Sequence, residues 1–77
     1  MSNYRPLRTQ CWEKYLTSQG FKLKRTRGSH DQWVKPGKRT IPVWGNYKEI
    51  PAMHIKSSSR SIGVTTESIY QWADKNC

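Results

Sequence analysis

The chain is poor in the aliphatic residues that build most protein cores. Leu, Ile, Val and Phe occupy only 12 of its 77 positions, and its formal net charge is +9. Low hydrophobicity combined with high charge is typical of disordered chains. Four Trp and four Tyr compensate for this, because a large aromatic side chain buries roughly 150–250 Å². A chain this short supports one core. The sequence therefore predicts a single folded domain, residues 1–77, with a core that depends on aromatic rings.

Basic residues outnumber acidic ones by 14 to 5. An excess of this size indicates an anionic partner, and nucleic acid, an acidic membrane surface and an acidic protein all fit it. No apolar stretch approaches the ~20 residues of a membrane-spanning helix, and the N-terminus lacks the apolar segment of a signal peptide. We therefore expect a cytoplasmic protein with no membrane segment, a monomer or small oligomer when free.

The two cysteines, Cys11 and Cys77, form neither a disulfide framework nor the spacing of a zinc site. In a reducing cytosol we expect both to be free thiols rather than joined end to end. The five acidic residues do not form a cluster of the oxygen ligands that magnesium needs. No metal ion or other cofactor is therefore expected.

The hydrophobic pattern predicts a helix followed by three short strands. Thr9 is expected to cap the helix, whose apolar residues share one face, and Gly20 to end it. The strands are expected over 21–26, about 30–35 and 39–43. Strict alternation in the first strand would bury Phe21 and Leu23 and expose Lys22, Lys24 and Thr26.

Two helices are expected after the strands. One opens at Pro51 and ends at Gly63, weakened by the serine run 57–59, and a last short helix is capped by Thr65 or Thr66. The predicted fold is therefore α+β, with a three-stranded antiparallel sheet covered by helices on one face. The other face would be flat and basic. Such a surface fits an A-form helix or folded RNA, contacted through phosphates and 2′-hydroxyls.

A dense basic run leads directly into the triplet Gly28-Ser29-His30. Imidazole titrates near neutrality, so His30 is suited to proton transfer at a phosphodiester. Neighbouring cations would stabilise the charge that develops on the phosphorus-bound oxygens, and Gly28 permits close backbone approach. The same residues also fit a histidine that simply begins a strand on a basic surface.

Several of these segments together resemble the HicA toxins of bacterial type II toxin–antitoxin modules. They are Gly20-Phe21, the basic strand, Gly28-Ser29-His30, Ile41-Pro42-Val43, Lys48-Glu49-Ile50 and Gly63-Val64-Thr65. The similarity covers roughly residues 6–73. It implies a fold like the double-stranded RNA-binding domain, ribosome-independent cleavage of mRNA, and a HicB-type antitoxin partner that covers the site.

The resemblance implies that His30 is the catalytic residue of this mRNA interferase. We expect the RNA backbone to be bound by residues of the basic strand, the triplet and the following turn: Lys22, Lys24, Arg25, Arg27, Gly28, Ser29, Lys35 and Arg39. Two positions depart from the family pattern. Trp44 stands where the family often has a histidine, and Ser57–Ser59 replace residues that are usually Ile or Leu, which suggests a looser helix.

Other candidate residues have a structural interpretation. His54 is expected to be exposed or to fill a helix face rather than to act in catalysis. Trp33, Trp44 and Tyr47 are able to stack on unpaired bases, but a chain so poor in aliphatics needs most of its rings in the core. Asp31 is next to His30 in sequence and therefore points to the other face of the strand.

Three functions remain open from the sequence. The first is a metal-free endoribonuclease toxin that uses His30 as general acid or base. The second is a non-catalytic RNA-binding module of the same fold, and the third is an adaptor for an acidic protein. Because RNA binding is common to the first two, only cleavage distinguishes them.

Overall fold

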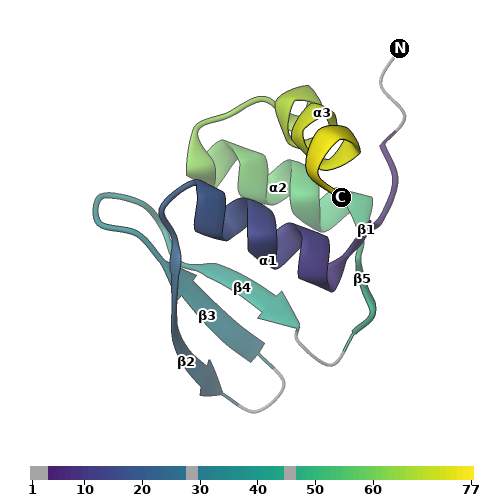
Figure 1. Cartoon of the computed structure of the whole chain (residues 1–77). Helices are drawn as coiled ribbons and strands as arrows, with labels where there is room; N and C mark the ends of the chain where they lie inside the picture. Colours follow the sequence, from purple (N-terminus) through teal and green to yellow (C-terminus); the bar gives the residue numbers. More distant parts are fainter. Residues whose placement is uncertain (1–3, 28–29, 45–46) are drawn as a thin grey trace.

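The structure is a computed structural model that describes residues 4–27, 30–44 and 47–77. Its elements are β1 (Leu7–Arg8), α1 (Thr9–Ser18), β2 (Lys22–Arg27), β3 (His30–Val34), β4 (Ile41–Trp44), β5 (Glu49–Ile50), α2 (Ala52–Ile62) and α3 (Thr66–Asn76). The three helices lie together on one side of the antiparallel sheet β2-β3-β4 (Figure 1). The fold is therefore α+β and like the double-stranded RNA-binding domain, as predicted. The last helix is as long as α2, not a short addition.

Helix α1 ends as its sequence predicts but begins differently. Gly20 adopts a positive φ of 89°, and its N–H and that of Phe21 donate to carbonyls of the last helical turn. A residue without a Cβ adopts this conformation at little cost. At the start, Thr9 is the first helical residue rather than the cap. Its hydroxyl donates instead to the Tyr47 carbonyl, at 2.5 Å, which attaches the loop before β5 to α1.

The central sheet contains an irregularity that the alternating pattern did not predict. Between Leu23 and Arg25 the register of β2 against β3 shifts, so that Lys24 is an extra residue in β2. Leu23 pairs with buried Trp33, yet half of its surface is exposed. The strict alternation predicted for this strand is therefore wrong beyond Lys22. Strand β4 also begins two residues later than expected.

A second, two-stranded sheet joins the segment before α1 to the segment before α2. Leu7 pairs with Ile50 and Arg8 pairs with Glu49 in antiparallel register. Leu7 and Ile50 are both buried. These strands have two residues each, too few to show a period in the sequence. They fix the start of α2 beside α1.

The serine run does not interrupt α2. Ser58 and Ser59 are buried, and the Ser59 Oγ donates to the Lys56 carbonyl at 2.6 Å and lies 3.1 Å from the Thr66 Oγ1 of α3. The small hydroxyl side chains thus form part of the contact between α2 and α3. Gly63, with φ of 90°, ends α2, and Thr65 caps α3 by accepting from the Ser68 N–H, both as predicted.

Aromatic side chains supply much of the core, as the composition predicts. Trp12, Tyr15, Phe21, Trp33 and Tyr70 are buried in one cluster with the aliphatic residues, and Trp72 packs against it. Tyr15 packs face to face with Trp12 and edge to face with Trp72. The expectation that Trp12 and Trp72 belong to the core is therefore confirmed.

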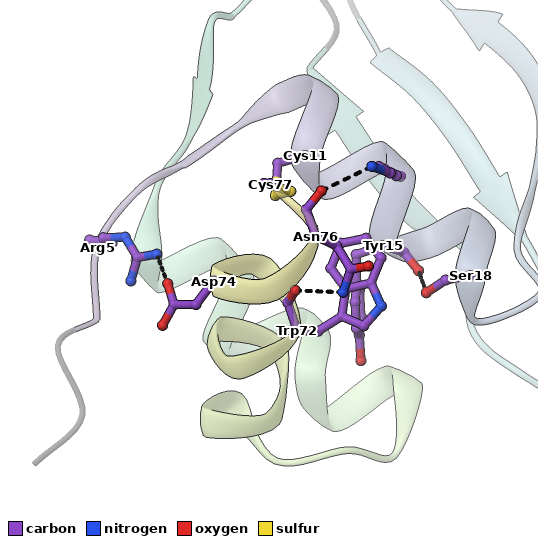
Figure 2. The surroundings of a disulfide bond; sticks show 9 residues. Arg5, Cys11, Tyr15, Ser18, Trp72, Asp74, Asn76 and Cys77 are labelled. Carbon is purple, nitrogen blue, oxygen red and sulfur yellow. Dashed lines mark hydrogen bonds and ion pairs between the residues drawn. A yellow bond between two sulfur atoms is a disulfide. The ribbon is translucent and has the colours of Figure 1, made fainter.

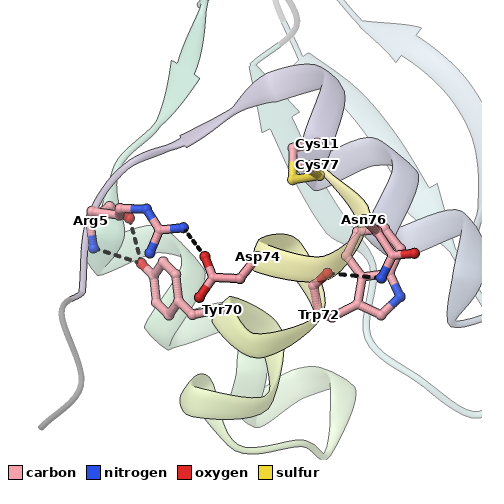
Figure 3. Close-up of polar contacts among 7 residues, drawn as sticks. All are labelled: Arg5, Cys11, Tyr70, Trp72, Asp74, Asn76 and Cys77. Atoms are coloured by element: carbon pink, nitrogen blue, oxygen red, sulfur yellow. Dashed lines mark hydrogen bonds and ion pairs between the residues drawn. A yellow bond between two sulfur atoms is a disulfide. The ribbon is translucent and has the colours of Figure 1, made fainter.

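The segment before β1 is attached to α3 through Arg5 (Figure 3). The Arg5 guanidinium is 2.7 Å from a carboxylate oxygen of Asp74, and it lies over the ring of Tyr70. The Tyr70 hydroxyl donates to the Arg5 carbonyl at 2.5 Å. Burial raises the pKa of Tyr70, so this hydroxyl keeps its proton and remains a donor at neutral pH.

The expectation of two free thiols is wrong in this structure. Cys11 and Cys77 form a disulfide between the first turns of α1 and the residue after α3 (Figure 2), with their Cα atoms 6.0 Å apart. Packing of α3 beside α1 brings them together, and the Lys14 ammonium donates to the Asn76 carbonyl at 2.9 Å in the same contact. The two cysteines are 66 residues apart in the sequence, so no local pattern indicates the pairing.

Candidate functional site

His30 begins β3 and lies on the open face of the central sheet. It pairs with Trp44 of β4 and, on the other side, with the backbone of Arg27 of β2. Successive side chains of a strand point to opposite faces. Trp33 and Val43 are buried on the face that the helices cover, so the half-buried His30 is on the opposite, uncovered face. His30 therefore lies on the face of the sheet that the helices leave uncovered, where the sequence placed it.

The indole of Trp44 contacts two imidazole rings. Its centroid is 4.9 Å from that of His30 and 4.7 Å from that of His54, and both contacts are edge to face, with interplanar angles of 78° and 73°. Edge-to-face pairs at such separations are favourable. Trp44 thus packs directly against the candidate catalytic ring and fixes one side of it.

His54 of α2 contacts this cluster, which the sequence did not indicate. Its Nε2 is 2.8 Å from the carbonyl oxygen of Pro42 in β4. Because a carbonyl oxygen only accepts hydrogen bonds, Nε2 must carry the hydrogen, which leaves the proton-free Nδ1 as an acceptor in the neutral ring. His54, expected to be exposed or to fill a helix face, makes specific contacts from α2: it holds the helix against the sheet edge and packs against Trp44.

The predicted RNA-binding cations extend along the sheet rather than gather at His30. Lys22, Lys24 and Arg25 are exposed on β2, and Arg25 pairs with Gln32, two residues from His30. Lys22 pairs with Val34 at the far end of β3. Lys35 follows β3, so at about 3.3 Å per residue it begins roughly 16 Å from His30.

Lys35 and Arg39 belong to the opposite end of the sheet from His30. The Lys35 side chain passes close to Gly20, at the turn between α1 and β2. Arg39 is exposed in the connection between β3 and β4, beyond the pair formed by Trp33 and Ile41. A ligand that contacts all the described cations would therefore have to span the length of the sheet.

Asp31 faces away from His30, as the strand alternation predicts. It pairs with Val43, on the helix-covered face. There it influences Glu13 of α1, since burial and, secondarily, the negative charge of Asp31 raise the pKa of Glu13. This pair of carboxylates therefore affects the stability of the fold.

Replacing Glu13 with glutamine is expected to raise the melting temperature slightly at neutral pH. The raised pKa means that folding favours protonated Glu13, so the wild-type chain loses stability as pH rises from the ordinary glutamate value, 4.5, through the raised one. Glutamine is neutral at every pH. Thermal unfolding should thus show a higher melting temperature for Glu13→Gln than for the wild type at pH 7, and this difference should disappear near pH 3. Glu49→Gln removes the same charge from an exposed strand residue and serves as the control. If Glu13→Gln raised the melting temperature equally at pH 7 and pH 3, the prediction would be contradicted.

Some of the predicted site lies outside the described residues, namely Gly28 and Ser29 of the triplet. Within the described part of the chain, no group of three or more His, Cys, Asp or Glu residues is arranged to hold a metal ion. Over the same residues, no helix has the length and apolar character needed to cross a membrane.

Fold and site together define a class: a small α+β protein like the double-stranded RNA-binding domain, with a histidine on the open face beside a cationic strand. A family model described as the HicA toxin of bacterial toxin–antitoxin systems matches residues 12–64. Because the match covers more than half of the chain, this protein belongs to the HicA toxin family, whose members are in general RNase-type toxins. No curated protein and no solved structure gives a significant match.

Proposed function

We propose that this protein is a ribosome-independent endoribonuclease, an mRNA interferase, that cleaves RNA without a metal ion. The observation that carries the proposal is the position of His30, half-buried but on the uncovered face of the sheet next to β2. Exposed Arg25 on that strand is suited to bind a phosphate near the imidazole, and Lys22 and Lys24 extend the cationic surface.

The proposed reaction uses the RNA's own 2′-hydroxyl as nucleophile. A general base removes its proton, the 2′-oxygen forms a bond to the adjacent phosphorus, and the bond from phosphorus to the 5′-oxygen breaks. That leaving oxygen receives a proton, so the products are a 2′,3′-cyclic phosphate and a 5′-hydroxyl. His30 acts as the base or the acid in this scheme. Arg25 and the other cations stabilise the charge on the non-bridging oxygens.

The proposed partners follow from the same family and site. The substrate is mRNA in the cytoplasm, and the partner is a HicB-type antitoxin that silences the toxin by covering the face that carries His30. Such a partner would have to cover an exposed cationic strand, so an acidic contact surface is expected on it.

RNA cleavage in the presence of excess chelator tests this function. Purified protein incubated with an unstructured RNA should produce fragments that end in a cyclic phosphate, identified by mass spectrometry. Binding without cleavage would support the non-catalytic RNA-binding module instead. Fragments that appear only when a divalent cation is added would contradict the metal-free reaction.

A further inference from the structure

A partly apolar hollow opens beside the His30 cluster, between the end of β4 and the first turns of α2. It has a volume of about 550 Å³ and is lined by Trp44, Tyr47, Pro51, Met53, His54 and Ser57. Met53 is 82% exposed and Tyr47 is 55% exposed. Exposure of two large apolar side chains in one concave site is unusual for a chain with so few of them, and it indicates a binding surface.

The walls of this hollow are fixed by contacts within the protein. The Tyr47 backbone is held at both ends, because its N–H donates to the Trp44 carbonyl at 3.1 Å and its carbonyl accepts from Thr9 at 2.5 Å. His54 is fixed by its hydrogen bond to Pro42. These contacts fix the Tyr47 backbone and the His54 ring before a ligand binds, which lowers the ordering cost of binding for this part of the wall.

Trp44 connects the hollow to the candidate catalytic residue. The same indole lines the hollow and contacts the His30 ring, with 4.9 Å between the centroids. A group bound in the hollow is thus separated from His30 by one aromatic side chain. For a polynucleotide whose phosphate lies at His30, a neighbouring nucleotide is placed to reach the hollow.

The lining favours a nucleobase over other ligands. Aromatic rings and a methionine thioether bind the flat faces of bases, and the Ser57 hydroxyl and the His54 Nδ1 are able to form hydrogen bonds with base edges. None of the six lining residues is acidic. Exposed Lys48 and Lys56 are adjacent in sequence to the lining residues Tyr47 and Ser57, so the surroundings attract a phosphate-linked ligand.

We propose that this hollow binds one unpaired base of the RNA, next to the phosphate held at His30. The proposal rests on the proposed endoribonuclease function and adds to it a base-binding subsite. Stacking in the hollow requires an unpaired base, so the subsite selects single-stranded RNA over a continuous duplex, whose bases stack on one another.

Short RNAs with a single abasic residue test the subsite directly. A set of labelled eight-nucleotide RNAs, each lacking one base at a different position, is titrated against the His30→Ala protein, which keeps the RNA intact. We expect one position to bind roughly ten- to a hundredfold more weakly than the complete RNA. With the wild-type chain, the sensitive position should adjoin the cleaved bond.

A matched pair of variants assigns the effect to the hollow. In the His30→Ala background, Tyr47→Ala together with Met53→Ala should bind complete RNA about tenfold more weakly and lose the distinction between complete and abasic RNA. Tyr4→Ala is the control, because Tyr4 is also an exposed tyrosine but contacts Glu67 and Tyr70 of α3. It should keep the distinction. Melting temperatures verify that all variants fold.

Three results would overturn the subsite. One is equal binding of complete and abasic RNA by the parent protein. The second is a Tyr47→Ala, Met53→Ala protein that still distinguishes them. The third is a double variant that binds RNA normally and fails only to bind the antitoxin, which would make the hollow a protein-docking surface. Failure of the endoribonuclease function is seen separately, as intact RNA after incubation with the wild-type chain, and it leaves the binding experiment interpretable.

Discussion

Replacing His30 with alanine is expected to slow RNA cleavage by about 10²–10⁴-fold, the usual contribution of a positioned acid or base. This corresponds to a loss of roughly 3–5 kcal/mol of transition-state stabilisation. Folding should change little, because His30 is only half-buried and its edge-to-face contact with Trp44 contributes about 1 kcal/mol. Single-turnover cleavage of a labelled RNA, with thermal unfolding of the same samples, measures both effects. RNA binding should persist.

His54→Ala is the matched control, since it removes the other imidazole that contacts the same indole. This variant loses the hydrogen bond to Pro42 and the contact with Trp44, so it should melt at a lower temperature and bind RNA more weakly. Its cleavage rate at saturating RNA should fall less than tenfold. If His30→Ala cut RNA and arrested growth as well as the parent, or if His54→Ala had the larger loss of rate, His30 would not be the principal catalytic residue.

The helix boundaries were predictable because their determinants are local. Gly20 and Gly63 adopt positive φ where the helices end, and the Thr65 side chain caps the next helix. Each of these signals acts within a few residues. Thr9 shows the limit of this reasoning. A threonine at a helix start is able to cap the helix with its hydroxyl. Here the hydroxyl binds instead to the carbonyl of Tyr47, which is 38 residues away in the sequence but adjacent in the fold.

The sheet was predictable in number and order of strands but not in detail. The extra residue at Lys24 changes which cations share a face with His30. The two-residue alternation of apolar and polar side chains does not indicate where such a bulge occurs. Strands β1 and β5 are stabilised by burial of Leu7 and Ile50 against the core rather than by their own sequence. Pairing between distant segments therefore decides these features.

The candidate site was predictable at its centre and not at its edges. The sequence indicated His30 as a candidate, because it follows a basic strand and because the Gly28-Ser29-His30 triplet resembles that of the HicA toxins. The contacts of Trp44 with His54, and the hollow they share, depend on α2 docking against the edge of β4. On the other side of α2, buried Ser58 and Ser59 belong to the contact with α3, although in isolation they suggest a weak helix.

Reduction of the Cys11–Cys77 disulfide is expected to be the largest single change in stability. The bond closes a loop with a sequence separation of 66 residues, and in the chain-entropy account a loop of this length stabilises the folded state by about 4 kcal/mol. In a domain of this size each kcal/mol corresponds to about 4–8 °C in melting temperature. The melting temperature should therefore fall by roughly 15–30 °C when a reductant is added under otherwise identical conditions.

The double variant Cys11→Ala, Cys77→Ala provides the control for the reductant itself. It should melt near the temperature of the reduced wild-type chain, and reductant should not shift it further. Thiol titration of the unreduced, unfolded wild type should detect no free thiol. Two titratable thiols in that sample, or a melting temperature that reductant leaves unchanged, would show that the bond does not form in solution. The hydrogen bond from Lys14 to Asn76 and the packing of Tyr15 on Trp72 would then hold the end of α3 to α1.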